Sequence, residues 1–143
     1  MTKSLKGNED WQAMTIDGFV GLIGPLLRRR EEDGSKRYAL RVGPAHLNHI
    51  GSLHGGVITS LLDQTIALEA WNAAGRKPTV TIQMDTRFLG AAREGELITA
   101  RAKIRKATRS MIFVDADVTS QEDDLLASAT AVMKIMQREA PHG

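Results

Sequence analysis

The chain has no cysteine among its 143 residues. This absence excludes a disulfide framework, a thiolate metal site and a cysteine nucleophile. Charge of one sign is not in excess either, because 19 Lys and Arg stand against 17 Asp and Glu. A net charge this small gives no general signal for binding polyanions.

Long hydrophobic runs are also missing. The segment GFVGLIGPLL, residues 18–27, has about ten residues, against the ~20 that a transmembrane helix needs. The opening segment MTKSLKGNEDW carries lysines without an apolar stretch behind them, so we expect no signal peptide. We therefore expect a cytoplasmic protein that does not associate with membranes.

What is present indicates one globular domain, with 42% hydrophobic and 25% charged residues. Residues 1–17 are polar and irregular, with one short helix expected at 11–17. The segment PLLRRREEDGSKRYALRV predicts a hairpin, because Asp33-Gly34 is a strong turn signal. Its arginine run, 28–30, raises the alternative of nucleic-acid binding. Strand alternation sends these side chains to opposite faces, so we favour a solvated edge strand and expect no nucleic-acid partner.

The segment after this hairpin, GPAHLNHIGSLHGG, lacks an apolar period and is predicted to be a loop. Helical spacing follows from Val57 to Ala74, with Gly75 as the stop signal. This helix has almost no polar face, so we expect it to be buried. Four runs of period two then predict an antiparallel meander, at 79–90, 96–107, 110–121 and 124–136. Together with the hairpin, they predict a six-stranded sheet wrapped around one long helix.

Asp63 lies inside this apolar helix, where a carboxylate is costly to bury. Its helical neighbours are small, which would let a ligand or another backbone approach: Gly56, Thr59, Ser60, Ala67 and Ala70. A structural cap or salt bridge is the alternative role for this aspartate. His54 stands nine residues earlier, about half a turn out of phase and ~13 Å away along the axis. One chain could hardly bring the two side chains together, whereas two chains could.

The pair Gly55-Gly56 opens the helix, where unpaired backbone N–H groups and the helix dipole can hold a developing oxyanion. The same loop also contains His46 and His49. Their spacing does not match the H-E-x-x-H pattern, and no carboxylate stands nearby in sequence, so we expect no metal site.

The stretch NHIGSLHGGVITSLLD closely resembles the signature of hotdog-fold acyl-CoA thioesterases, in the phenylacetate-pathway (PaaI-type) branch. The resemblance extends from about Gly24 to Met136 and includes the segments GPLLRR, TVTIQMDTRFLG and FVDADVTSQEDDLLASATAVMKI. It implies an α+β hotdog fold that dimerises through its sheet edges. The corresponding boundaries are an N-terminal extension at 1–20, the hotdog domain at 21–138 and a tail at 139–143.

The resemblance also implies roles for single residues. Asp63 would attack the thioester carbonyl or activate a water, and the Gly55 N–H would bind the thioester oxygen. Asn48 and His54 would position the thioester or the water, and Thr81 would lie near the water. Such a site combines Asp63 and Thr81 of one subunit with the other three residues of its partner. A threonine in a strand is otherwise unremarkable, so the role of Thr81 rests on the resemblance alone.

Coenzyme A carries phosphates, which implies basic residues near the mouth of the site. Lys106 and Arg109 flank the turn KATRS, with Gly56 as a further contact at the helix start. Thr108 stands where relatives often have glycine, which puts close contact between phosphate and this backbone in doubt. For either cation taken alone, solvated surface charge is the favoured interpretation.

The expected activity is hydrolysis of acyl-CoA thioesters by a homodimer or homotetramer, with no cofactor beyond the substrate. A hydratase or dehydratase acting on acyl thioesters is one alternative, and a non-catalytic acyl-CoA-binding module is another.

Two further expectations concern the sheet. A turn centred on Thr108 would place Arg101 opposite Asp115 and Lys103 opposite Phe113, with Ala102 and Ile104 facing the helix opposite Val114 and Ile112. The strand at 79–89 would lie at the sheet edge and pair with its own copy in an obligate dimer.

Overall fold

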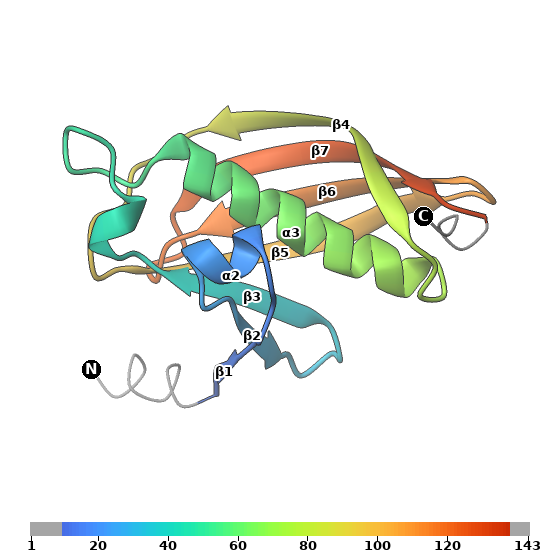
Figure 1. Cartoon of the computed structure of the whole chain (residues 1–143), viewed down its shortest axis with the longest axis horizontal. Helices are drawn as coiled ribbons and strands as arrows, with labels where there is room; N and C mark the ends of the chain where they lie inside the picture. The colour runs from blue at the N-terminus through green and yellow to red at the C-terminus, as the bar shows by residue number, and fades with distance from the viewer. Residues whose placement is uncertain (1–9, 138–143) are drawn as a thin grey trace.

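The long helix of this protein packs on one face of a large antiparallel sheet (Figure 1). The computed structural model describes residues 10–137. The elements are β1 (Gln12–Ala13), α2 (Phe19–Ile23), β2 (Leu27–Arg30), β3 (Lys36–Arg41), the 3-10 turn η1 (Pro44–His46), α3 (Gly55–Ala73), β4 (Thr79–Phe88), β5 (Leu97–Ala107), β6 (Met111–Thr119) and β7 (Leu125–Ile135). The helix and the antiparallel sheet match the expected architecture, and the two-residue strand β1 makes the sheet seven-stranded rather than six-stranded.

The predicted hairpin is confirmed in β2 and β3, which pair from Leu27 opposite Ala39 to Arg30 opposite Lys36. Its turn depends on Gly34, whose φ of +87° is unfavourable for other residues. The Ser35 hydroxyl and backbone N–H both donate to the Asp33 carboxylate. These two hydrogen bonds hold the pKa of Asp33 below its usual value.

The short helix expected at 11–17 is wrong. Gln12 and Ala13 form β1 instead, antiparallel to β2. They supply hydrogen-bond partners to the outer edge of β2, which would otherwise leave backbone groups unpaired. The helical turn comes later in the chain, as α2.

The expected four-stranded meander is only partly present, because β4 does not pair with β5. The sheet order is β1-β2-β3-β5-β6-β7-β4, so β4 lies at the edge beside β7. The connection at 89–96 crosses the end of the sheet and bonds to three separate places on the way. Leu89 N–H donates to the Leu126 carbonyl, the Ala92 carbonyl accepts from Leu53 N–H, and Gly95 N–H donates to the Val42 carbonyl. The crossing delivers β5 next to β3.

The hairpin of β5 and β6 has the expected faces but different partners. Lys103 lies opposite Asp115, and Arg101 lies opposite Asp117, two residues from the expected position. The turn is centred beyond Thr108, whose N–H donates to the Met111 carbonyl, and a bulge near Arg105 adds one residue to β5. Because the net shift is even, each side chain keeps its predicted face.

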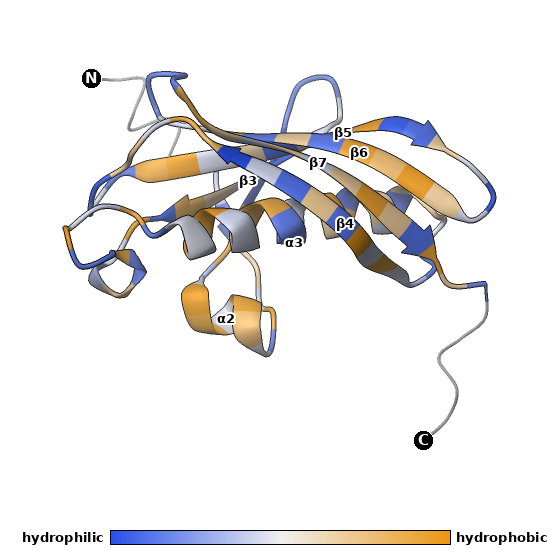
Figure 2. Ribbon diagram, turned by 90° about the horizontal axis from the view of Figure 1, so that it is seen from above, coloured by the Kyte–Doolittle hydropathy of each residue, from blue (hydrophilic) through white to orange (hydrophobic). Residues whose placement is uncertain are grey.

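The expectation that α3 is buried all round is wrong for the single chain. One stripe faces the sheet and is buried: Ile58, Leu61, Leu62, Thr65, Ile66 and Ala70. The rest of the helix surface is more open, and Asp63, on the flank that faces β4, is exposed. Figure 2 shows why this surface is open. Helix α3 lies along one side of the sheet, and α2 covers only part of the helix on the side away from the sheet. Within residues 10–137 the structure has no helix with the length and apolar character that crossing a membrane requires.

Tyr38, the only tyrosine of the chain, is buried in β3. Burial, assisted by the negative charge of Glu69, raises its pKa from 10.0 to about 12. The unfolded chain therefore ionises at lower pH than the folded one. The stabilisation from keeping the phenol neutral is complete below pH 10 and is lost as pH rises toward 12.

We expect the phenolate absorbance of the folded protein to titrate with a midpoint near pH 12. Tyr38→Phe should abolish the signal and remove this contribution to the loss of stability at high pH. Far-UV circular dichroism must show that the protein is still folded at the midpoint. A midpoint near 10 in folded protein would contradict the burial of this hydroxyl.

Candidate active site

Helix α3 begins at a histidine cap. His54 is the N-cap residue, and its Nδ1 accepts the backbone N–H of Gly56 at 2.8 Å. Its own backbone N–H donates to the His46 carbonyl at 2.8 Å, which fixes the loop below. The exposed imidazole therefore has a structural role, because it satisfies one of the N–H groups that every helix start leaves unpaired.

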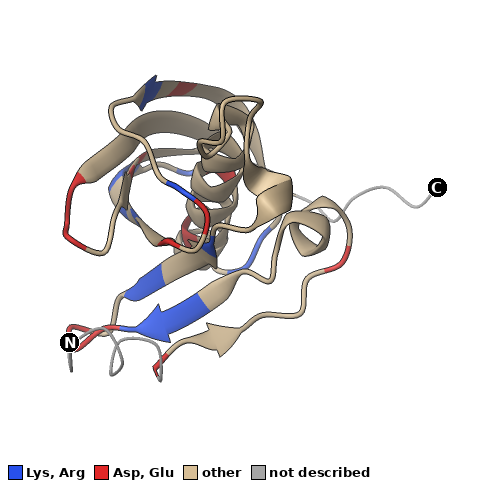
Figure 3. Cartoon of the chain, turned by 90° about the vertical axis from the view of Figure 1, so that its left-hand side faces the viewer, with Lys and Arg blue, Asp and Glu red and all other residues tan. Residues whose placement is uncertain are grey.

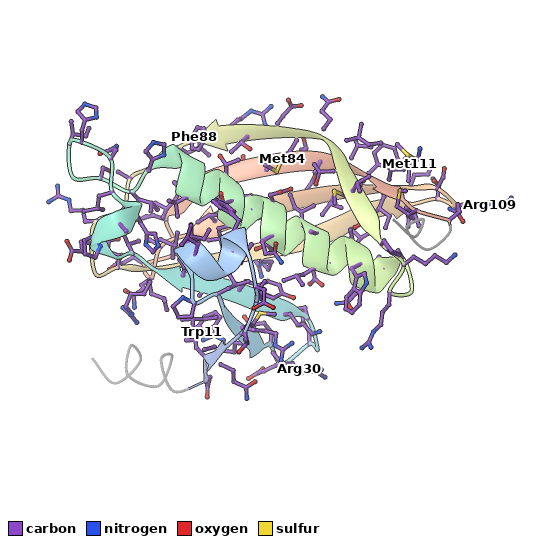
Figure 4. The ribbon with its side chains drawn as sticks, in the orientation of Figure 1. Trp11, Arg30, Met84, Phe88, Arg109 and Met111 are labelled. Atoms are coloured by element: carbon purple, nitrogen blue, oxygen red, sulfur yellow. The ribbon has the colours of Figure 1, made fainter. Side chains whose placement is uncertain are left out.

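The two glycines that follow are both required by close contacts. A Cβ on Gly56 would lie 3.0 Å from the His54 Nδ1, so a larger residue would disturb the cap. A Cβ on Gly55 would lie 3.2 Å from the ring of Phe88, which comes from the end of β4 (Figure 4). The Gly55 N–H has no acceptor within the described part of the chain. It is thus a free donor at the positive end of a helix of 19 residues.

Asp63 lies two turns further along α3 and meets β4. Thr81 Oγ1 donates to Asp63 Oδ1 at 2.9 Å, which leaves Oδ2 open. A bulge between Thr81 and Gln83 shifts the strand register at this point. Bulges are frequent next to active sites, where they re-aim a side chain. Among residues 10–137, Asp63 forms no salt bridge, and its mid-helix position is not a cap. The structural alternative for this aspartate therefore has no support within the single chain.

Asn48 shapes the loop that precedes the helix. Its Oδ1 accepts the backbone N–H groups of Ile50 and Ser52, each at 3.0 Å. A bridge between Leu47 and Leu53 closes the base of the loop. The side-chain NH2 of Asn48 has no partner among the described residues, so it is available as a donor.

The other loop histidines differ in environment. His46 is buried, with Nδ1 accepting the Gly43 N–H and Nε2 lying 2.6 Å from the Ile23 carbonyl. It connects the loop to α2 and serves the structure. His49 is exposed. Residues 10–137 contain no group of three or more His, Asp or Glu side chains that could hold a metal ion.

Lys106 and Arg109 lie far from the helix start in the same chain. Both are exposed, and Arg109 belongs to the hairpin turn, where its carbonyl accepts the Gln137 side-chain amide. The adjacent Ser110 bonds to Ile135, which pairs with Thr79, the first residue of β4. Phe88 ends the same strand, so Arg109 and the glycine pair are separated by about 30 Å, the length of a ten-residue strand. Figure 4 shows the labelled side chains of Phe88 and Arg109 at opposite ends of the sheet.

The chain thus brings the predicted residues together in two groups. Asp63 and Thr81 form one, at the middle of α3. Asn48, His54, Gly55 and Gly56 form the other, at its start. His54 and Asp63 belong to one continuous helix, so the ~13 Å between them cannot close within a chain. Sequence reasoning missed Phe88. Its only signal was an aromatic residue at the end of a largely polar strand.

Comparisons with known proteins agree with this geometry. Residues 50–127 match the model of the thioesterase superfamily. A Pseudomonas aeruginosa protein, whose name gives an unproven esterase activity, is 31% identical over 82% of this chain and 87% of its own length. Human acyl-coenzyme A thioesterase 13 is 28% identical over 85% of this chain and 86% of its own length.

A solved structure extends the similarity to three dimensions. A mutant of the phenylacetic acid degradation protein PaaI from Thermus thermophilus is 25% identical, covers 84% of this chain and 100% of its own, and superposes with a TM-score of 0.74. The hotdog fold expected from the sequence motif is confirmed.

The cap at His54 leads to a stability prediction. His54→Ala removes the acceptor for Gly56 N–H and should lower the free energy of unfolding by about 1 kcal/mol, the usual cost of a lost N-cap. His54→Asn supplies another good capping residue and should stay within a few tenths of a kcal/mol of the parent protein. Urea unfolding with an unchanged m-value measures both. Equal stability of the alanine variant and the parent would show that the cap contributes nothing.

Proposed function

Because the chain belongs to the thioesterase superfamily, we propose that it hydrolyses acyl-CoA thioesters to the free acid and coenzyme A. The names of two similar proteins support this substrate class, one an acyl-coenzyme A thioesterase and the other a phenylacetic acid degradation protein. No cofactor beyond the substrate is required. The cytoplasmic location expected from the sequence stays a prediction.

The observation that carries the proposal is the hydrogen bond between Thr81 and Asp63. It turns the carboxylate to a fixed orientation and occupies only Oδ1, so Oδ2 is free to accept a proton or to attack. The carboxylate is exposed in the single chain, and no cation of residues 10–137 neutralises it. An anionic, oriented and accessible carboxylate is what nucleophilic or general-base chemistry needs.

The chemistry follows from these groups. In the general-base route, Asp63 takes a proton from water, and the resulting hydroxide adds to the thioester carbonyl carbon. The Gly55 N–H stabilises the oxyanion, and the C–S bond then breaks to release the thiolate of coenzyme A, which is protonated. In the nucleophilic route, Asp63 adds to the carbonyl carbon itself, and the C–S bond breaks to release the thiolate of coenzyme A, which is protonated. Water then hydrolyses the resulting mixed anhydride to the free acid and the carboxylate of Asp63. Both routes use the same residues.

A dimer completes the site in this proposal. Strand β4 is a ten-residue edge with large apolar side chains exposed: Val80 at 47%, Ile82 at 53% and Phe88 at 55%. An unpaired edge of this kind invites pairing with another strand. Antiparallel pairing of two β4 strands would set the two α3 helices side by side, with their open faces toward each other. Asp63 and Thr81 of one subunit would then share a site with Asn48, His54 and Gly55 of its partner.

The same two-fold symmetry provides a role for the distant cations. The two-fold axis would exchange the two ends of β4. Arg109 of the partner subunit would then lie toward the Phe88 end of this chain, next to Gly55 and Gly56. We propose that Lys106 and Arg109 act there on the phosphates of coenzyme A. Arginine favours phosphate because its guanidinium donates two parallel hydrogen bonds.

Hydration of an acyl thioester is the competing reaction, and plain acyl-CoA binding is the competing function. Hydration requires a histidine free to move a proton. Here the Nδ1 of His54 accepts the Gly56 N–H, so the neutral imidazole carries its proton on Nε2 and has no free lone pair to act as a base, which favours hydrolysis by Asp63. In the proposed dimer, the free donor of one subunit and the fixed carboxylate of the other would share one site, which favours catalysis over binding alone.

Replacing the carboxylate tests the proposal directly. Asp63→Asn keeps an acceptor for Thr81 but removes the base, so kcat should fall by about 10²–10⁴ with a much smaller change in KM. Release of the free thiol from a panel of acyl-CoAs measures it. Stability should change by less than about 0.5 kcal/mol, because Asp63 is exposed. Asp117→Asn makes the same change on the exposed part of β6 and should leave kcat unchanged. Normal turnover by folded Asp63→Asn would remove Asp63 from the mechanism.

Mixing two defective variants tests the shared site. Asp63→Asn and His54→Asn should each be nearly inactive alone. After unfolding and refolding together, each heterodimer would contain one intact site and one site lacking both groups. About a quarter of the parent activity should return, since half of the dimers are mixed and each has one working site. Recovery of no more than the sum of the two residual activities would place both residues in one subunit.

A further inference from the structure

A basic cavity lies at the edge of the sheet opposite to β4. It has a volume of about 600 Å³ and is lined by Asp10, Gln12, Arg28, Arg29, Arg30 and Lys36. These residues come from β1, β2, β3 and the chain just before them. In Figure 3 the ribbon of the adjacent strands β2 and β3 is coloured blue where Lys and Arg residues gather, and Figure 4 shows Arg30 at this end of the molecule.

Three of these cations have no carboxylate partner within residues 10–137. Arg30 lies directly opposite Lys36 in the β2–β3 ladder, and Arg28 lies two residues along on the same face. None of the three forms an ion pair with any residue from 10 to 137. Like charges directly opposite each other in a sheet are destabilising. Among the described residues 10–137, the lining contains one carboxylate, Asp10, against four cations.

Arg29, in the same strand, differs from these three cations because it has a carboxylate partner. Its Nε lies 3.0 Å from a Glu31 oxygen, and its guanidinium packs 4.4 Å from the centre of the Trp11 ring. Arg37 shares the same glutamate at 3.1 Å. Glu31 therefore pairs with Arg29 and Arg37 on one face of the hairpin. Arg28, Arg30 and Lys36 have no such partner among residues 10–137, and they line the cavity together with Arg29.

We propose that this cavity binds a diphosphate group, as found in inorganic pyrophosphate, a nucleoside diphosphate or coenzyme A. Arg28 and Arg30 have Cα atoms about 7 Å apart along the strand, so their guanidinium groups can converge on neighbouring phosphoryl groups. Arginine forks match phosphate oxygens, and a lysine adds a third charge. A cavity of about 600 Å³ is larger than a single phosphate requires and lies in the range of small-molecule sites.

This site is separate from the candidate active site. The cavity lies at the β1 and β2 end of the sheet order, and Thr81 belongs to β4 at the other end. Lys106 and Arg109 belong to β5 and the β5–β6 turn and do not line the cavity. Diphosphate binding here does not depend on whether Asp63 hydrolyses a thioester.

Isothermal titration calorimetry of the full chain with inorganic pyrophosphate tests the proposal at about 0.15 M salt, where surface charge is well screened. We expect saturable binding with one site per chain. Arg30→Gln and Lys36→Gln should each raise the dissociation constant for pyrophosphate by about tenfold or more, the usual effect of losing a charge-assisted hydrogen bond. Lys77→Gln removes the same charge from an exposed position outside the cavity and should bind as the parent does.

Titrations with different ligands distinguish the possible sources of the diphosphate group. If coenzyme A fills the cavity, its titration should lose one site per chain in Arg30→Gln. If the source is a free nucleotide or inorganic pyrophosphate, ADP or pyrophosphate binds and the stoichiometry of coenzyme A is the same in both proteins. Three results would overturn the proposal: no saturable pyrophosphate binding, equal weakening by Lys77→Gln, or binding of a single-stranded oligonucleotide in place of pyrophosphate.

Discussion

Helix α3 buries one stripe of side chains on the sheet and leaves the rest of its surface more open. Each large aliphatic residue in that stripe contributes about 1.5–3 kcal/mol through burial, which fixes the rotation of the helix about its axis. With the rotation fixed, the carboxylate of Asp63 points away from the stripe and toward β4. The bulge beside Thr81 brings the hydroxyl into reach. The orientation of the proposed catalytic carboxylate is thus a consequence of apolar packing on the other side of the helix.

The start of the same helix is held by a second set of contacts. His54 caps Gly56, the main chain of His54 bonds to His46, and His46 in turn reaches the carbonyl of Ile23 in the segment before β2. Phe88 covers Gly55 from the end of β4. The free N–H of Gly55 therefore stands in a rigid setting, which an oxyanion site needs, because donors that must move cost energy during the reaction.

The two edges of the sheet differ in chemistry. The β4 edge is long and carries exposed apolar side chains, and the carboxylate of Asp63 lies beside it. The edge formed by β1 and β2 is short and carries an excess of cations. One edge is suited to a second copy of the chain and the other to an anion. A net charge of only +2 for the whole chain conceals this separation.

The sequence by itself determined the local elements of this protein. Three features were readable: the turn at Gly34, the alternation in β6 and β7, and the helical spacing with its stop near Gly75. Each is encoded by residues that lie close together in the chain. The HGG motif and Asp63 also identified the candidate site, because residue type and spacing along one helix are readable without coordinates.

Only the tertiary structure decided the strand order, the partners in the β5–β6 hairpin, the exposure of Asp63 and its contact with Thr81. Each depends on groups far apart in the chain. The connection at 89–96 selects β3 as the neighbour of β5, and a bulge near Arg105 shifts the pairing. Periodicity tells which face a side chain takes, since that is set by the backbone of its own strand. Which element meets that face is set by how the whole sheet assembles and packs on α3.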